Sequence, residues 1–509
     1  MSNVIVLNMG LKSVRSIIFD NKGNKLASAS LSLETTLSGD QVTQKPSEWL
    51  SKSLEVIKET LSIAKCKVDY ITVTSSSSCL VCIDSNGNPL DDAIMVSDKR
   101  AHNEAIELAN AQSFYEVKNK TGLGADPYLM LPKILWVKNN NISVYKQTYK
   151  FLSPNDFLIG QLSGKFITDY FNAQKYHYDS NTQSYPVTLL NELNIEVNKL
   201  PEVVSPGTII GKMKIEIQDF LTIKNDVNVV VTTYDAICSF FGSGPSDEGD
   251  ATDVSGTVTT FRVLSQKSKI DTSTKIFNQP FYDWGISIVG GSNNLGGGLI
   301  EWVKQCYYLN DSYPYEIMEK DARESELGAN GLIFLPYLLG ERAPIWDNNA
   351  RGVFFGLERF HTRKDMTKAV FESAGFVIKD MIDSIEEAGV KVSNIRLSGG
   401  LARIGYISQL KADITGRDVL ILDDFETTAI GAALLTFVGV KEFKNVKEAS
   451  SRFVSIRMII KPNQKNHEKY IKIHQLYKKT YLTLKDLFKD RQELIDDLFI
   501  HRNAVIENL

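Results

Sequence analysis

Residues 331–347 read GLIFLPYLLGERAPIWD, and residues 350–357 continue with ARGVFFGL. The first stretch begins as an apolar segment, typical of a buried strand, and then becomes polar and aromatic. Glu341, Arg342 and Asp347 follow the expected end of that strand. Charged side chains in this position either line a cleft or pair with each other to hold a loop, and both interpretations stay open.

Two glycine turns lie on either side of this stretch. Downstream, a strand at Ile395–Leu397 ends in Ser398-Gly399-Gly400 and leads into an expected helix at 406–413. A glycine turn before a helix N-terminus suits an anion or nucleotide, but an ordinary tight turn looks the same. Upstream, Ser255-Gly256-Thr257 joins two expected strands. Its amides and the Thr257 hydroxyl can bind a phosphate, although many hairpins share this pattern.

Further upstream, residues 229–236 read VVVTTYDA, so that Asp235 follows an apolar strand and precedes an expected helix. A carboxylate in this position can orient an attacking hydroxyl and accept its proton. An Asp in this position is also a common helix N-cap. The sequence alone leaves both roles open for Asp235.

The chain opens with strands at Val4–Leu7 and Val14–Phe19 and with extended structure at Lys25–Leu33, which predicts a β-meander. The strand-turn-strand order recurs at Ala251–Val254 and Thr259–Val263. With 509 residues, the chain is too long for one core. We therefore expect a duplicated α/β architecture with two domains that meet near residue 245 and enclose a cleft.

Composition excludes several classes of function. The apolar fraction of 43% and the charged fraction of 23% are those of a globular protein. The net charge of -4 predicts no nucleic-acid or membrane partner, and no apolar run reaches the roughly 20 residues of a membrane span. The N-terminus resembles a strand rather than a signal peptide. Five scattered cysteines predict reduced thiols in a cytoplasmic protein. Cys79 and Cys82 form a C-x-x-C that is either a core pair or, less favoured, a redox or metal site.

Taken together, these segments resemble the FGGY family of carbohydrate kinases, similar to xylulokinases and gluconokinases, within the actin/hexokinase/Hsp70 ATPase superfamily. The similarity is carried by GLIFLPYLLGERAPIWD, by ARGVFFGL, by SGGLAR at 398–403 and by ETTAIGAA at 426–433, and it extends over residues 4–488. It implies two ribonuclease-H-like (actin-like ATPase) domains with an active-site cleft between them. The implied domains are 1–244, which binds sugar, and 245–488, which binds nucleotide, with a helical extension at 489–509.

The resemblance implies an ATP-dependent kinase that uses Mg²⁺, with Asp235 where the family has its catalytic base. It places ATP against the first turn, the second turn and the adenosine loop, and sugar against a serine loop and its surroundings. The implied nucleotide-binding residues are Gly10, Lys12, Ser13, Gly256, Thr257, Gly399, Gly400 and Ala402, and the implied sugar-binding residues are Ser77, Ser78, Asp98, Tyr234 and Asp235. A homodimer is an expectation from the family alone.

The sequence departs from the family pattern in the first turn, in the sugar pocket and in the adenosine loop, where Leu401 replaces a third glycine. The family begins with an Asp-x-Gly-Thr turn whose carboxylate helps to hold Mg²⁺, whereas this chain has Asn8 and Leu11 at the corresponding positions. Asn8 is the candidate metal ligand, but a neutral amide is a poorer partner for a hard cation. One hypothesis is that Lys12 meets the phosphates instead, as a point charge. In the sugar pocket, SSSSC at 75–79 replaces a Ser-Gly-Gln-Met-His-type segment. These departures leave a non-catalytic sugar- or nucleotide-binding homologue as the alternative; a chaperone-like ATPase is the most remote interpretation.

Overall fold

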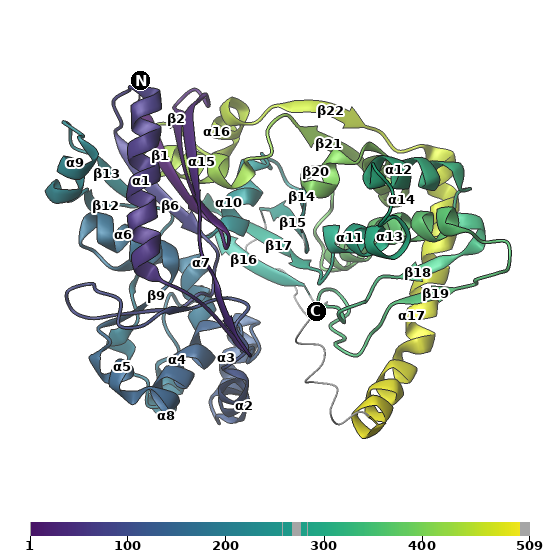
Figure 1. Cartoon of the computed structure of the whole chain (residues 1–509), viewed down its shortest axis with the longest axis horizontal. Helices are drawn as coiled ribbons and strands as arrows, with labels where there is room; N and C mark the ends of the chain where they lie inside the picture. Colours follow the sequence, from purple (N-terminus) through teal and green to yellow (C-terminus); the bar gives the residue numbers. More distant parts are fainter. Residues whose placement is uncertain (1, 257, 267–275, 282–283, 499–509) are drawn as a thin grey trace. The chain divides into compact units, whose positions relative to one another are not determined.

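The computed structural model describes residues 2–256, 258–266, 276–281 and 284–498, and it forms two compact units (Figure 1). The first unit comprises Met1–Gly244 and Glu426–Val454, and the second comprises Pro245–Phe425 and Ser455–Leu509. Each unit is built around one large mixed sheet with its own buried apolar clusters.

The sheet of the first unit has six strands in the order β12-β13-β6-β1-β2-β3. The opening meander is confirmed, because β1 pairs antiparallel with β2 and β2 pairs antiparallel with β3. β6 and β13 then continue the sheet in parallel. Every residue of β1 is buried, as its apolar sequence predicts. The strands are β1 (Asn3–Met9), β2 (Ser13–Asp20), β3 (Lys25–Ser32), β6 (Tyr70–Ser75), β12 (Ile209–Lys212) and β13 (Asn228–Val231).

The sheet of the second unit has seven strands in the order β16-β17-β15-β14-β20-β21-β22. β14 pairs antiparallel with β15 and parallel with β20, as β1 pairs with β2 and β6 in the first unit. The predicted duplication is therefore present in the strand order. The strands are β14 (Asp250–Ser255), β15 (Thr259–Ser265), β16 (Phe277–Phe281), β17 (Ile286–Ser292), β20 (Asn394–Gly399), β21 (Asp418–Leu422) and β22 (Ile456–Ile460).

Helices cover both sheets, and small strands join the connecting loops. Those of the first unit are α1 (Pro46–Ala64), α2 (His102–Asn110), α3 (Phe114–Thr121), α4 (Met130–Asn140), α5 (Ile142–Gln147), α6 (Pro154–Ser163), α7 (Tyr170–Ala173), α8 (Val187–Glu192), α9 (Ile215–Leu221), α10 (Asp235–Gly242), α15 (Thr427–Gly439) and α16 (Val446–Phe453), with β4 (Thr36–Ser38), β5 (Gln41–Gln44), β7 (Val81–Ile83), β8 (Ala93–Ile94), β9 (Lys150–Leu152), β10 (Ile167–Asp169) and β11 (Glu202–Val204). Those of the second unit are α11 (Gly297–Tyr307), α12 (Pro314–Glu324), α13 (Arg363–Glu387), α14 (Gly405–Thr415) and α17 (Gln464–Leu498), with β18 (Ile333–Leu335) and β19 (Val353–Phe355).

The segment 426–454 packs with the first unit, although the sequence interpretation placed it in the domain 245–488. Its helix α15 lies against α10 at very close range. A Cβ added to Gly242 would lie 1.8 Å from the Thr427 carbonyl oxygen, and one added to Gly431 would lie 1.7 Å from that of Cys238. Only glycine permits this approach, so the contact is built into two residues far apart in the sequence.

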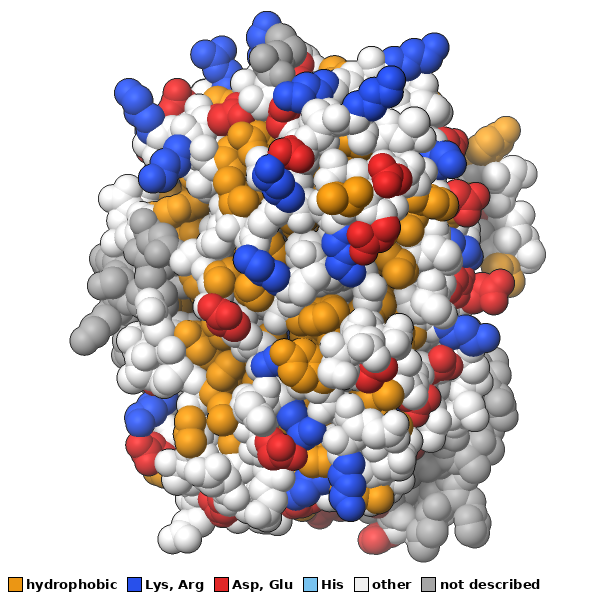
Figure 2. All heavy atoms as spheres, turned by 90° about the vertical axis from the view of Figure 1, so that its left-hand side faces the viewer, with side chains coloured by type: hydrophobic (Ala, Val, Ile, Leu, Met, Phe, Trp, Pro, Cys, Tyr) orange, Lys and Arg blue, Asp and Glu red, His pale blue; other side chains and the backbone are white. Residues whose placement is uncertain are grey.

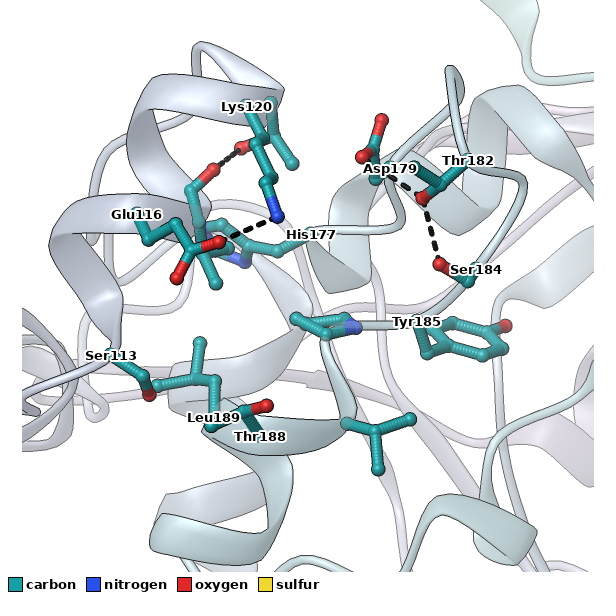
Figure 3. A pocket seen from close by; sticks show the side chains of 14 residues that line it. Ser113, Glu116, Lys120, His177, Asp179, Thr182, Ser184, Tyr185, Thr188 and Leu189 are labelled. Atoms are coloured by element: carbon teal, nitrogen blue, oxygen red, sulfur yellow. Dashed lines mark hydrogen bonds and ion pairs between the residues drawn. The ribbon is translucent and has the colours of Figure 1, made fainter.

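The helix α17 runs without interruption from Gln464 to Leu498, so residue 489 is not the start of a separate element. Its side chains form several hydrogen bonds to the rest of the second unit, among them Tyr470 to Glu372, His474 to Asp380, Tyr477 to Tyr337 and Tyr481 to Asp347. Among the described residues, no helix combines the length and the apolar character that a membrane span requires. On the face drawn in Figure 2, Lys and Arg side chains lie scattered among Asp, Glu and apolar side chains.

Candidate active site

The first predicted phosphate turn joins β1 to β2. The Gly10 amide donates to the Ser13 carbonyl at 2.9 Å, and the Gln44 side-chain amide donates to the Leu11 carbonyl at 2.7 Å. Lys12 and Leu11 are exposed, whereas Asn8 in the preceding strand is only 6% exposed. The turn is thus fixed through its backbone, and Lys12 is the cation that it presents to solvent.

Asp235 is the first residue of α10, directly after the segment that leaves β13. The N-cap position belongs to Tyr234, and the Asp235 side chain is partly exposed. The Ser76 hydroxyl donates to Asp235 Oδ2 at 3.5 Å. A carboxylate in the first turn of a helix is stabilised by the helix dipole. Asp235 is therefore the first residue of the helix, and the N-cap position that the sequence also allowed for it belongs to Tyr234.

Two ionisable groups near Thr233 and Tyr234, the residues that precede Asp235, could not be identified from the sequence. The Lys175 ammonium lies 5.0 Å from the centre of the Tyr234 ring, and Tyr234 itself is almost wholly buried. Asp169, fully buried at the start of α7, accepts hydrogen bonds from the amide of Phe171 and the side chain of Asn172. Burial raises the pKa of Asp169 to about 6. The only sequence signal for Asp169 was its place before a short helix.

The serine loop that follows β6 contains both predicted sugar-binding serines. Ser77 is partly exposed, whereas Ser78 is buried and has a positive φ of 61°. Ser75 donates to Asn155 at 3.1 Å, which anchors the start of the loop. Cys79 and Cys82 follow as buried residues, and burial raises the pKa of their thiols to about 11 and about 12. Protonated, buried thiols support the core-pair interpretation of the C-x-x-C.

Asp98 is completely buried and accepts four hydrogen bonds. Its Oδ2 accepts from the Val42 amide at 2.6 Å and from Arg100 Nη2 at 2.7 Å. Its Oδ1 accepts from the Arg100 amide at 3.0 Å and from Arg100 Nε at 2.8 Å. A carboxylate offers about four lone-pair positions in total. The carboxylate of Asp98 is therefore saturated by the chain itself.

The second predicted phosphate turn begins at Ser255 and Gly256; Thr257 lies outside the described residues. Below it, Lys411 Nζ lies 2.5 Å from Asp253 Oδ2 and 3.2 Å from the Ser255 hydroxyl. Asp253 and Lys411 are both essentially unexposed. The strand that leads into this turn is thus supported by a buried ion pair, which also bonds to the Ser255 hydroxyl.

The adenosine-side loop reaches the same place, because Ser255 and Gly399 are partners in the β14–β20 ladder. Gly399 has a φ of +84°, and an added Cβ would lie 2.5 Å from the Ser255 carbonyl oxygen. Gly400 is exposed, and Ala402 is buried in the 3₁₀ turn Gly400–Arg403. The Gly297 amide at the start of α11 donates to the Gly256 carbonyl at 2.7 Å. The structure therefore brings Gly256, Gly399 and Gly400 together with a helix N-terminus that the sequence had not marked as part of the site.

The charges of the 331–347 stretch hold a loop. Glu341 accepts from the amides of Asn294 and Arg342, both at 2.8 Å, and burial raises its pKa to about 7. Arg342 donates to the Asn293 carbonyl at 2.9 Å. Asp347 accepts from the Asn349 amide and the Tyr481 hydroxyl, both at 2.9 Å. These side chains bind backbone and neighbouring groups of the second unit rather than one another.

Comparison with known proteins agrees with this arrangement. The profile of the N-terminal domain of the FGGY family of carbohydrate kinases matches residues 3–242, and that of the C-terminal domain matches residues 252–440. The chain belongs to this family. The kinase is 26% identical to the xylulose kinase of Staphylococcus xylosus, over 94% of this chain and 99% of that protein. It is 24% identical to the gluconokinase of Bacillus subtilis, over 85% and 87% of the two chains.

Solved structures show the same relationship. The gluconate kinase from Lactobacillus acidophilus superimposes with a TM-score of 0.89 at 26% identity, covering 96% of this chain and 99% of that one. The ligand-bound xylulose kinase from the same organism gives a TM-score of 0.88 at 26% identity, covering 95% and 98%. The two-domain actin-like ATPase fold and the activity class, an ATP-dependent carbohydrate kinase, follow from the family membership.

Proposed function

We propose that this kinase transfers the terminal phosphoryl group of ATP to a hydroxyl of a ketose, polyol or sugar acid, with Asp235 as the general base. The observation that carries the proposal is the partly exposed carboxylate at the start of α10, beside the Ser76 hydroxyl. A base must reach the proton that it removes. Asp98 is completely buried and already accepts four hydrogen bonds from the chain, so we do not assign the base to it.

The remaining residues divide between acceptor and nucleotide. We assign the acceptor to Asp235, Ser77 and the surroundings of Ser78, and we give Asp98 and Tyr234 supporting roles because both are buried. For the nucleotide we assign the turns that begin at Gly10 and at Gly256, together with Gly399, Gly400 and Ala402. Backbone amides at such turns and at helix N-termini can bind phosphate oxygens, so a charged side chain is not required there. In phosphoryl transfer, positioning and electrostatic stabilisation supply most of the rate.

A magnesium ion fits this residue set only in part. Mg²⁺ prefers oxygen ligands and commonly binds through one or two carboxylates, water molecules and substrate phosphates. Asn8 offers a neutral amide oxygen from a nearly buried side chain, and Asp235 offers a carboxylate. We therefore propose that the phosphates of ATP supply most of the negative charge around the ion, with Asn8 contributing at most one oxygen. When bound, the ion would neutralise charge on the phosphates.

The proposal is tested with Asp235→Asn, measured as ATP consumption with D-xylulose, D-gluconate or glycerol as acceptor. We expect turnover to fall by about 10²- to 10⁴-fold, with acceptor binding measured by calorimetry largely retained. Asp226→Asn is the matched control, because Asp226 is an exposed carboxylate paired with Lys212 on the same unit. Near-normal turnover in Asp235→Asn would reject Asp235 as the base.

One observation supports a second candidate. Asn8 and Leu11 replace a carboxylate and a hydroxyl of the family's first turn, which are the groups expected to hold metal and phosphate. A homologue that binds sugar or nucleotide without turnover would be the result. Such a protein would bind an acceptor in calorimetry yet consume no ATP with any of the three acceptors, with either Mg²⁺ or Mn²⁺.

A further inference from the structure

Lys133 is a buried lysine on α4. Its side chain is 0% exposed, and among the described residues no carboxylate lies within ion-pair distance of its ammonium. Nζ donates instead to two backbone carbonyls, those of Ser78 at 2.6 Å and Met95 at 2.8 Å. Burial lowers the pKa of Lys133 to about 8. Burying an amine whose hydrogen-bond partners are neutral carbonyls costs folding free energy, which favours a specific role for Lys133 in this place.

The two carbonyls belong to the two segments that carry the predicted sugar-binding residues. Ser78 ends the serine loop in a left-handed conformation, with φ of 61°. The Met95 carbonyl also accepts the Asp98 amide at 3.2 Å, which closes the turn that leads to Asp98. Lys133 thus joins the serine loop to the Asp98 turn through one nitrogen atom.

The same face of α4 supports the Asp98 turn a second time. Trp136 follows Lys133 by three positions, so the two side chains lie on one side of the helix. The Arg100 guanidinium lies 4.8 Å from the centre of the Trp136 ring, and it binds both carboxylate oxygens of Asp98. Lys133 thus contacts both segments, and Trp136 contacts the Asp98 turn through Arg100.

We propose that Lys133 is a positioning residue that sets the geometry of the acceptor pocket and so determines acceptor affinity and selectivity. The inference rests on the proposed function, since it takes the serine loop and the Asp98 turn as parts of that pocket. Lys133 itself does not touch the acceptor in this account. It acts through Ser78 and Met95, whose carbonyls it holds at a fixed separation.

The test compares Lys133→Met with Lys138→Met. Lys138 lies on the same helix and also donates to a backbone carbonyl, that of Leu193 at 2.6 Å, outside the two segments. Methionine preserves the length of the side chain and removes the donor. We expect Lys133→Met to raise the acceptor KM by about tenfold or more, because small misplacements in a binding site are costly. The KM for ATP should stay within about twofold, and Lys138→Met should change neither constant.

A purely structural role would affect the two substrates alike, so equal rises of the acceptor KM and the ATP KM would overturn the inference. An unchanged acceptor KM in folded Lys133→Met would overturn it as well. If Lys133→Met does not fold, Trp136→Leu decides. It leaves the Lys133 hydrogen bonds in place and should raise the acceptor KM by about threefold, and no change would reject the role of α4.

Failure of the inference is separable from failure of the proposed function. The wild-type protein is first assayed for turnover with D-xylulose, D-gluconate and glycerol. If it consumes no ATP, the proposed function fails, and the dissociation constants of the three compounds for wild type and Lys133→Met replace KM as the readout. If the wild-type protein binds none of them, the assignment of the pocket fails and the inference falls with it.

Discussion

The hairpin turns of the two units occupy equivalent places in the duplicated sheets, but the side chains of the strands that lead into them differ in chemistry. Met9 ends β1 opposite Val14, and Ser255 ends β14 opposite Thr259. Below the first turn lie Leu7 and Met9, both apolar and 1% exposed. At the matching positions of β14 lie Asp253 and Ser255, and Lys411 of α14 forms an ion pair with Asp253 and a hydrogen bond with the Ser255 hydroxyl.

The difference shows that a repeated backbone does not require repeated chemistry. In both turns the glycine amide forms a hydrogen bond within the turn, from Gly10 to the Ser13 carbonyl and from Gly256 to the Val258 carbonyl. This feature comes with a connection between two antiparallel strands. The side chains near each turn are not dictated by the backbone. Apolar packing of Leu7 and Met9 supports the first turn, and the ion pair of Asp253 with Lys411 supports the second. A substitution that removes charge should therefore lower the free energy of unfolding most near the second turn. A substitution that changes side-chain volume should lower it most near the first turn.

The largest effect is expected from Lys411→Met, which leaves the buried carboxylate of Asp253 without its partner. Removing one partner of a buried ion pair typically lowers the free energy of unfolding by about 3–5 kcal/mol. Near the first turn, Met9→Leu conserves side-chain volume, so it should lower the free energy of unfolding by less than about 1.5 kcal/mol. Urea denaturation at pH 7 measures both changes in the free energy of unfolding. Equal decreases in the two variants would contradict the proposed difference between the two turn regions.

A smaller effect is expected from alanine at the glycines of the two turn regions. Gly399→Ala forces a Cβ into a residue with φ of +84° and against the Ser255 carbonyl, which should cost about 1–3 kcal/mol. At Gly10 the nearest atom to an added Cβ is the Ser13 carbonyl oxygen at 3.7 Å, an ordinary contact. Gly10→Ala should therefore change the free energy of unfolding by less than about 1 kcal/mol. Thermal unfolding compares the two variants, and the reverse order would contradict the close approach at Gly399.

A pH-dependent effect separates paired from unpaired buried carboxylates. Unlike Asp253, Asp156 in the first unit is 0% exposed and has no cationic partner among the described residues, and burial raises its pKa to about 8. In the unfolded chain this group ionises near pH 4. Between these values the folded state binds more protons than the unfolded state, so the contribution of Asp156 to stability falls as pH rises.

Asp156→Asn removes that titration and retains an acceptor for the Ser153 amide. Relative to wild type, the variant should gain roughly 1 kcal/mol per pH unit between pH 5 and pH 8. Denaturation curves at pH 5, 6, 7 and 8 test this slope. A difference between variant and wild type that does not change with pH would mean that Asp156 is ionised in the folded protein.

The smallest effect is expected from Lys12→Ala in the first turn. Lys12 is exposed and would meet the phosphates of ATP as a mobile point charge. Its loss should raise the KM for ATP by about threefold while leaving the acceptor KM unchanged. Steady-state kinetics at fixed Mg²⁺ provides the measurement, with Lys22→Ala, on the next turn of the meander, as the control. An unaltered KM for ATP would show that Lys12 does not compensate for Leu11.

Much of the fold could be predicted because its signals are local. The strands β1, β2, β14 and β15 follow from apolar runs bounded by turn residues, and their repeated order predicted the duplication. The placement of 426–454 could not be predicted in this way. It depends on Gly242 and Gly431, which allow two helices to meet although nearly two hundred residues separate them in the chain.

For the site, the sequence by itself determined the family and proposed Asp235 and the glycine turns, because these residues carry family-specific patterns. Only the tertiary structure decided what surrounds them. The resemblance placed Asp98 in the sugar pocket, and the structure shows that its carboxylate accepts hydrogen bonds from Val42 and Arg100. Lys133 became notable only through the two carbonyls to which it donates. The physical reason is that a side chain's role depends on which donors, acceptors and charges remain unfilled around it, and those neighbours are assembled from distant parts of the chain.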